Sequence, residues 1–395
     1  MLIPAQPRAP ELGDEWRERS HDVERFRFPA GSCSTADQCV GSMTRRSTAM
    51  VFAPYLATMG GGERVICEVA DVLSECFAVE VCSPQVPDPV RWTRLGFPAL
   101  KIRKLNAREF AMRTLRAEVA VVMSNGVPLP SLAHRSYLIV QFPGDSAIPA
   151  TAWKRLRTRA ALSRYSVATY SKYNQAHIEE RWGVRATVLA PPVTQYLFDP
   201  VVKSPLILSV GRLSTDGGHK RHDALLDAWS LAKQQLPGWE LVIAGAVREG
   251  EVAADGLRQR AAEIGSARIE TDLSPDDLAV LYRRASIYWH AAGYGRSPDR
   301  PDLAEHFGMS TVEAMSAGAV PVVYSDGGQV EIVEGSRGRF WTTLEELVSE
   351  TVSLALDPDL SSAAEQVNGA AKAFNREAFR AKLLELVSAK HQCHD

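Results

Sequence analysis

The sequence predicts an α/β protein built from two Rossmann-like, doubly wound domains that face a cleft. Its 395 residues are too many for one compact core and suit two domains. Short apolar runs alternate with amphipathic stretches, as strands and helices do around a parallel sheet. A proline-containing stretch at residues 188–200 divides this alternation into two series, because proline continues neither a helix nor a central strand.

The first series predicts an N-terminal domain over residues 48–195. Its expected strands are residues 49–56, 78–82, 119–123, 137–142 and 166–170. Its expected helices are residues 63–73, 107–116, 153–163 and 172–182. The stretch 171–193 then leads into the linker and is assigned an architectural role.

The second series predicts a C-terminal domain over residues 200–375. Its expected strands are residues 206–211, 241–245, 268–270, 287–291 and 320–324, and its expected helices are residues 223–235, 256–264, 275–285 and 309–317. Gly318 is a suitable end for the last of these helices. A final helix at 376–390 is expected to pack back on the N-terminal domain. Ligands of such sheets bind at the carboxyl ends of the strands, so the cleft is the expected site.

The composition, with 45% hydrophobic and 23% charged residues, is that of an ordinary globular protein. No apolar run approaches the roughly 18 residues of a membrane span. Residues 1–47 lack the apolar core of a signal peptide and are expected to be a poorly ordered leader that folding does not need. We therefore expect a cytoplasmic protein.

The cysteines and acidic residues give no pattern of a metal site. No CxxC pair occurs, and no histidine lies at zinc-ligand spacing from a cysteine. Cys67, Cys76 and Cys82 are expected to be reduced residues of the folded core. The D-x-D sequence at 357–359 is expected to be a turn between helices, so neither a metal nor a cofactor is predicted.

The most specific pattern lies at residues 304–334. Glu305 and Glu313 are separated by seven residues, the first in a loop and the second on a helix. Between them, Phe307, Gly308 and Met309 bring backbone N–H groups to a helix N-terminus, which attracts negative charge. Spacing alone also suits two ordinary helix acids on a solvated surface.

This region resembles a known family. The segments IYWHAAGYG, EHFGMSTVEAMSAGAVPVV and GGQVEIVE resemble the donor-site signature of retaining family-4-type glycosyltransferases, the glycosyl transferases group 1, which have the GT-B fold. They are also similar to the EHFG-containing lipid-linked-oligosaccharide mannosyltransferases of eukaryotes. The resemblance runs from about Val51 to Phe340. It implies that Glu313 binds the ribose hydroxyls and Glu305 those of the donor sugar.

Two cations follow the first strand of the second series, Arg212 and Lys220. The resemblance implies that both neutralise the donor diphosphate, whose charge grows as it leaves. With Glu305 they form the expected catalytic set. Ordinary solvated cations are the alternative, and the neighbouring Arg221 leaves the choice between it and Lys220 open.

Five further positions are candidates at the cleft. Gly61 and Gly62 follow the first strand and are similar to the family's N-terminal loop, which faces the donor phosphates. Many relatives carry a histidine where this chain has Gln141, which hydrogen-bonds but cannot act as a base. Gln141 and Asp145 are therefore the acceptor-side candidates. His290 ends a strand beside the expected donor site and is either structural or a donor contact.

The resemblance implies a metal-independent hexosyltransferase that retains the anomeric configuration by front-face substitution. GDP-mannose is the favoured donor and a UDP-sugar is possible; a glycan, glycolipid or small molecule is the acceptor, and no nucleic acid is expected. Two alternatives remain. One is a sugar-nucleotide epimerase of the same fold, and the other is a non-catalytic nucleotide-sugar or glycan-binding protein.

Basic side chains outnumber acidic ones in residues 1–199, and the reverse holds in the rest of the chain. The basic residues gather beside Trp153 at Lys154, Arg155, Arg157, Arg159 and Arg164. This pattern predicts reversible contact with an anionic membrane, at the inner face. A solvated basic helix without a partner is the alternative.

Overall fold

The structure is a computed structural model that describes residues 47–58, 60–94, 97–144, 152–213, 220–247 and 253–388. Residues 46–395 belong to one compact unit. The expected leader up to residue 46 and Asp145 lie outside the described residues. So do the side chains at 152–155 and 157, which include Trp153, Lys154, Arg155 and Arg157.

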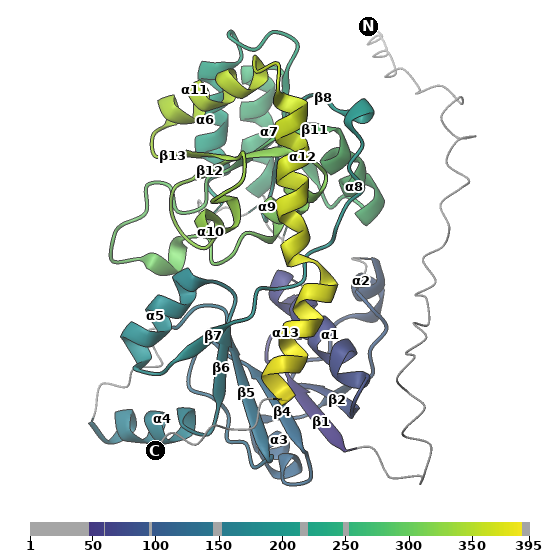
Figure 1. Cartoon of the computed structure of the whole chain (residues 1–395), viewed down its shortest axis with the longest axis vertical. Helices are drawn as coiled ribbons and strands as arrows, with labels where there is room; N and C mark the ends of the chain where they lie inside the picture. Colours follow the sequence, from purple (N-terminus) through teal and green to yellow (C-terminus); the bar gives the residue numbers. More distant parts are fainter. Residues whose placement is uncertain are drawn as a thin grey trace, which may run out of the picture. The chain divides into compact units, whose positions relative to one another are not determined.

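The first domain has a parallel sheet that, among the described residues, runs in the order β3-β2-β1-β4-β5-β6-β7 (Figure 1). The strands are β1 (Thr48–Phe52), β2 (Ala78–Ser83), β3 (Ile102–Lys104), β4 (Val119–Met123), β5 (Arg135–Val140), β6 (Ser166–Thr169) and β7 (Ala186–Val188). The helices are α1 (Gly61–Ser74), α2 (Pro89–Arg94), α3 (Ala107–Thr114), α4 (Ala152–Leu162) and α5 (Lys172–Trp182). All five residues of β4 are buried, as expected for a central strand covered on both faces.

The second domain repeats this plan with a parallel sheet that, in the part described, has the order β10-β9-β8-β11-β12-β13. The strands are β8 (Ser204–Val210), β9 (Glu240–Gly245), β10 (Ala267–Thr271), β11 (Ala285–His290), β12 (Val320–Tyr324) and β13 (Arg339–Trp341). The helices are α6 (His222–Ala232), α7 (Ala253–Ile264), α8 (Pro275–Arg284), α9 (Met309–Ser316), α10 (Gln329–Val333), α11 (Leu344–Ala355) and α12 (Leu360–Ala371).

Each sheet has one point where the strand order changes direction. In the first sheet β1 pairs with both β2 and β4, and in the second β8 pairs with both β9 and β11. At such a point the loops that follow two neighbouring strands turn to opposite faces and leave a crevice for a ligand. The loops after β8 and β11 are therefore where the topology places a ligand of the second domain.

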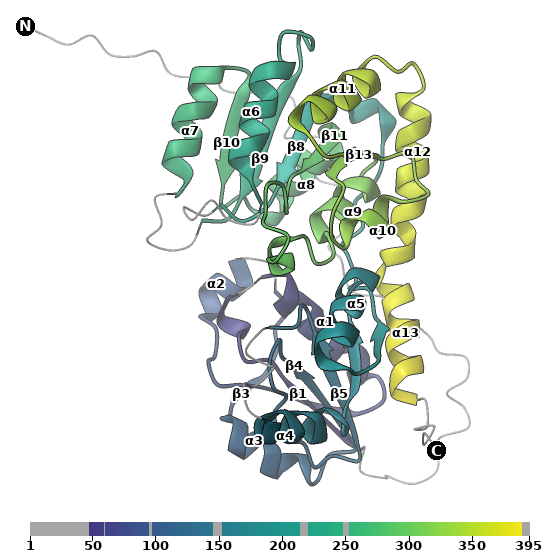
Figure 2. The same ribbon diagram turned by 90° about the vertical axis from the view of Figure 1, so that its left-hand side faces the viewer.

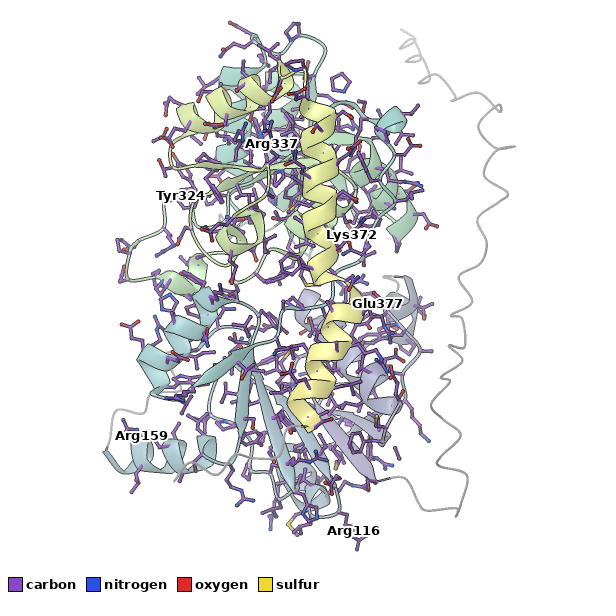
Figure 3. The ribbon with its side chains drawn as sticks, viewed as in Figure 1. Arg116, Arg159, Tyr324, Arg337, Lys372 and Glu377 are labelled. Carbon is purple, nitrogen blue, oxygen red and sulfur yellow. The ribbon has the colours of Figure 1, made fainter. Side chains whose placement is uncertain are left out.

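The chain crosses back to the first domain at its end. Helix α12 lies beside the second sheet, and α13 (Arg376–Ser388) lies beside the first (Figure 2). Lys372 and Glu377 mark the two sides of this crossing (Figure 3). Arg376 bridges Glu68 on α1 at 3.0 Å, and the apolar face of α13 buries Phe379, Leu383 and Val387.

The structure corrects several element boundaries. The first strand ends at Phe52, four residues before the expected end, because a turn and the short 3₁₀ helix Leu56–Thr58 follow it. Three edge strands, β3, β7 and β13, were not expected, since three residues give too little alternation to detect. Gly318 has φ +80° just after α9, as its predicted role requires. Cys67 and Cys82 are buried, but Cys76 is exposed because it follows the last turn of α1.

Candidate active site

Three side chains meet at the carboxyl edge of the second sheet. Lys220 lies just before α6, His290 is the last residue of β11, and Glu305 lies in the loop before α9. Glu305 Oε2 accepts a hydrogen bond from Lys220 Nζ and lies 2.9 Å from His290 Nε2. Lys220 and His290, which are 85 and 15 positions before Glu305 in the sequence, thus both contact one of its carboxylate oxygens at the predicted crevice.

The contacts of His290 define its tautomer. Its Nδ1 accepts a hydrogen bond from the backbone N–H of Ala292 at 3.3 Å, so that nitrogen carries no proton. The ring proton is therefore on Nε2, which donates to Glu305. Burial and the charge of Lys220 lower the pKa of His290, in agreement with a neutral ring. His290 is almost completely buried behind Glu305, which makes it a support for that carboxylate.

Glu305 is held in its charged form. Burial opposes the charge, but the Lys220 ammonium and the His290 hydrogen bond outweigh it and hold the pKa of Glu305 well below its ordinary value. A fixed, ionised carboxylate accepts hydrogen bonds from hydroxyl groups in defined directions. The site can therefore recognise a polyhydroxylated ligand beside a cation.

The two neighbouring cations Lys220 and Arg221 have different surroundings. Arg221 makes two hydrogen bonds of 3.1 Å to the Asp223 carboxylate and also donates to the carbonyl of Tyr294. It is committed to the fold, whereas Lys220 points to Glu305. Gly211 leaves the room for this, because a Cβ there would lie 3.0 Å from Lys220 Cγ. Arg212 is exposed after β8 and is not brought to Glu305 by any contact within the described residues.

The backbone of Glu305 rests on two glycines. Its carbonyl accepts from the Gly328 N–H at 2.7 Å. A Cβ on Gly327, which has φ +81°, would lie 2.4 Å from the same carbonyl. Only glycine fits this contact. The signal for both positions was present in the GGQVEIVE segment.

Helix α9 presents its N-terminus to the same crevice. Phe307 is buried and anchors the turn, and Gly308 adopts φ +109° immediately before Met309. Such a conformation is open to glycine and strained for other residues. The predicted turn is therefore present, immediately before the N-terminus of α9.

Glu313 lies on α9, apart from the Glu305 cluster. Its Oε2 accepts a hydrogen bond of 2.7 Å from the Tyr282 hydroxyl on α8, and burial raises the pKa of the Glu313 carboxyl. The Tyr282 ring stacks on Tyr196 with centroids 5.0 Å apart. Sequence reasoning missed both tyrosines because an isolated aromatic residue gives no sign of its partner.

A cavity of about 350 Å³ opens beside Glu313. It lies between the two domains, with Arg64 and Cys67 of α1 on one side and Met309 and Glu313 of α9 on the other. The linker and the start of α13 close it at Pro192–Gln195 and Asn375–Glu377. Glu313 is thus accessible to a ligand between the domains.

The first domain brings its candidates to the facing edge. A Cβ on Gly61 would lie 3.0 Å from Met309 Sδ, and one on Gly62 would lie 1.7 Å from Gln141 Nε2. The backbone N–H of Gln141 donates to Asn125 Oδ1 at 2.9 Å. Asn125, which follows β4, organises this loop and was not predicted. Asp145 lies outside the described residues.

The described ranges hold no group of three or more His, Cys, Asp or Glu side chains arranged to bind a metal ion. The D-x-D sequence forms the turn between α11 and α12. None of the helices among the described residues is both long and apolar enough to cross a bilayer.

Comparison with known protein families finds a match to the second domain. Residues 198–357, which include Glu305, Glu313, Lys220 and His290, match the family model "Glycosyl transferases group 1". Over these residues the chain is similar to the glycosyl transferases group 1. The predicted resemblance is confirmed.

Two curated relatives of this domain carry the same description, GDP-mannose:cellobiosyl-diphosphopolyprenol alpha-mannosyltransferase. The protein of Komagataeibacter xylinus is 28% identical over 178 residues, which are 43% of this chain and 42% of that relative. The protein of Xanthomonas oryzae pv. oryzae is 30% identical over 165 residues, 39% of this chain and 38% of that relative. The matched part thus spans about two fifths of each relative.

Solved structures extend the likeness to both domains. A glycosyltransferase from Rickettsia africae superimposes with a TM-score of 0.67 at 17% identity, covering 87% of this chain and 98% of that chain. Anabaena Alr3699/HepE in complex with UDP superimposes with a TM-score of 0.69 at 15% identity, covering 87% and 99%. At these identities the likeness concerns the fold, and it confirms the predicted GT-B architecture of two Rossmann-like domains.

Proposed function

We propose that this protein is a glycosyltransferase that moves a hexosyl group from a nucleoside-diphosphate sugar to an acceptor hydroxyl. The observation that carries the proposal is the Glu305 carboxylate, fixed between Lys220 and His290 at the switch point of the second sheet, inside the region that is similar to the glycosyl transferases group 1. A cation beside a hydroxyl-binding carboxylate suits the diphosphate and the sugar of one donor.

Each part of the donor has a candidate partner. Glu313 accepts hydrogen bonds from the ribose hydroxyls, within reach of the cavity that it lines. Lys220, Arg212 and the N–H groups at the start of α9 neutralise the diphosphate. Glu305 binds hydroxyls of the sugar. His290 acts through Glu305 and is a positioning residue.

The reaction follows from these roles. The acceptor oxygen attacks the anomeric carbon on the face that the diphosphate leaves, and the bond from that carbon to the phosphate oxygen breaks. The electron pair stays on the phosphate oxygen, which takes the acceptor proton. Lys220 stabilises the growing charge on the leaving diphosphate, and the enclosed crevice orients the reactants. The anomeric configuration is retained, and no metal is required.

The donor and acceptor are proposed from similarity. The EHFG sequence and the names of the two mannosyltransferase relatives favour GDP-mannose, while the UDP complexes among the structural neighbours support a UDP-sugar as the second candidate. A lipid-linked, polysaccharide or small-molecule hydroxyl is the acceptor. Gln141 lies at the facing edge of the first domain and is proposed, with Asp145, to contact it.

A donor-binding experiment with matched variants tests the proposal. Thermal shift with GDP-mannose and UDP-sugars should reveal one stabilising donor, since a ligand stabilises in proportion to the logarithm of its concentration over Kd. Lys220→Ala should abolish most of this shift, because a charge-assisted contact contributes about 1.5–3 kcal/mol. Arg221→Ala is the control. This variant removes a cation from the adjacent position, and its donor affinity should stay close to that of wild type. Equal donor affinity in wild type and Lys220→Ala would overturn the assignment.

A further inference from the structure

The first turn of α5 is docked on the donor loop of the other domain. Ser171 Oγ donates to the carbonyl of His306 at 2.7 Å, and Asn174 Nδ2 donates to the same oxygen at 3.0 Å. Both side chains are fully buried. Two buried donors from the first domain thus converge on one acceptor in the second.

The residues between these two donors make further contacts across the same boundary. The Lys172 N–H donates to Glu331 Oε1 at 2.8 Å, and the Tyr173 hydroxyl donates to the carbonyl of Pro301 at 3.1 Å. Four consecutive residues, 171–174, therefore each hydrogen-bond to the second domain. The contact between the domains is thus made by hydrogen bonds from one short segment.

The acceptor carbonyl belongs to the residue that follows Glu305. A Cβ on Gly328 would lie 2.3 Å from the His306 oxygen and 2.9 Å from Ser171 Oγ, so only glycine allows the three groups to meet. The His306 ring stacks on Phe142 of the first domain, with centroids 4.7 Å apart and an angle of 11°. Both the backbone and the ring of His306 are thus held by the first domain.

We infer that the first turn of α5 is a positioning element for Glu305. Ser171 and Asn174 fix the carbonyl of His306 and thereby set the adjacent Glu305 against the donor sugar. The inference rests on the proposed role of Glu305 in sugar binding. Because the donors and the acceptor belong to different domains, this additional support of Glu305 is present only when the domains are closed on each other.

Glu313 does not share this dependence. It lies within α9, eight residues after Glu305, and its hydrogen bond goes to Tyr282 of the same domain. Nucleotide binding through Glu313 should therefore survive loss of the α5 contact, while sugar recognition through Glu305 should not. This difference separates positioning from a general loss of structure.

The test compares a nucleotide sugar with its nucleoside diphosphate in calorimetric titrations. The probes are GDP-mannose with GDP, and UDP-glucose with UDP as the second pair. The variant Ser171→Gly/Asn174→Ala removes both donors; glycine is tolerated at a helix N-cap, so α5 should still form. Tyr173→Phe is the control, because it removes a bond across the same boundary without touching His306.

In the double variant we expect the preference for the nucleotide sugar over the diphosphate to fall about tenfold, with the Kd of the diphosphate unchanged. Tyr173→Phe should keep the wild-type preference. In a Glu305→Gln background the two α5 substitutions should have no further effect on the preference. If the double variant does not fold, Asn174→Ala alone gives the same comparison with the Ser171 cap intact.

An unchanged preference in the folded variant, or an equal loss in the Glu305→Gln background, would overturn the inference and leave the proposed function standing. Wild-type protein that binds no nucleotide sugar would overturn both. The two failures are thus distinguished by the wild-type titration.

Discussion

Lys220 and Arg221 illustrate how one residue position decides a role. Both lie just before α6, but Arg221, at φ +49°, turns its guanidinium to Asp223 and Lys220 turns its ammonium to Glu305. The sequence predicted a cation here and left the choice between the two open. The choice could not be made from the sequence, because the different directions of the two side chains depend on Gly211 and Tyr294, which lie far apart in the chain.

His222 makes the free energy of unfolding depend on pH. It begins α6 beside Lys220 and is buried; burial, followed by the Lys220 charge, lowers the pKa of His222 to about 4. The unfolded chain has an ordinary histidine pKa of about 6.5, so the unfolded state binds the proton first. The stabilisation from the neutral ring is therefore complete above about pH 6.5 and is lost as the pH falls towards 4.

From this shift, the wild-type free energy of unfolding should fall by about 3 kcal/mol between pH 7 and pH 4 through His222 alone. His222→Gln should remove this part of the pH dependence. Urea unfolding of both proteins at pH 7, 5.5 and 4 measures it. Parallel curves of stability against pH for the two proteins would show that His222 does not titrate in this way.

The long elements were predicted well because their periodicity is strong. Strands β4, β5, β8, β9, β11 and β12 were expected within a few residues of their positions, since continuous apolar runs mark buried parallel strands. The helices on the two sides of the D-x-D turn, which are α11 and α12, were expected but were given no bounds. The alanine- and serine-rich sequence of α12 has a weak contrast between its faces, which explains the omission.

Helix α13 follows the second domain in sequence but packs on the first. Ion pairs of Arg376 with Glu68 on α1 and of Arg380 with Glu75 just after α1 fix its direction, and its buried leucine Leu383 supplies the apolar contact. Surface ion pairs of this kind contribute little each. The stabilisation should therefore come chiefly from the buried face of α13.

Leu383→Ala should lower the free energy of unfolding by about 2–5 kcal/mol, as expected for a buried leucine truncated in a packed core. Leu356→Ala is the matched control, because Leu356 is 73% exposed at the end of α11. Its substitution should change stability by at most about 0.5 kcal/mol. Chemical denaturation followed by tryptophan fluorescence compares them, and equal effects of the two substitutions would refute the packing assigned to α13.

At the scale of the molecule, two parallel sheets of similar strand order each supply candidate site residues near the carboxyl ends of their strands. The second supplies Lys220, His290 and Glu305, and the first supplies Gly61, Gly62 and Gln141. The sequence predicted the two domains and named all six residues as candidates. The contacts that join the domains, such as Ser171 with His306, were not predictable because nothing local marks a hydrogen bond between residues 135 positions apart.

The basic segment of the first domain supports a further prediction for the whole protein. Arg159 on α4 (Figure 3) and the nearby Arg164 are both exposed. We predict that the protein co-sediments with anionic liposomes at low salt and is released at high salt, with each cation contributing about 1 kcal/mol at most. Arg159→Glu/Arg164→Glu should weaken this binding. No sedimentation at low salt would contradict the prediction.

The central claim is transfer of a sugar from a nucleotide donor to an acceptor. The most direct test is NMR analysis of the products after incubation with the stabilising donor and a panel of lipid-linked, polysaccharide and small-molecule acceptors. We predict release of the nucleoside diphosphate together with a new glycoside that has the anomeric configuration of the donor. Glu305→Gln protein should form little of it. A donor sugar converted into its epimer without transfer, or a donor that binds and remains unchanged with every acceptor, would contradict the account.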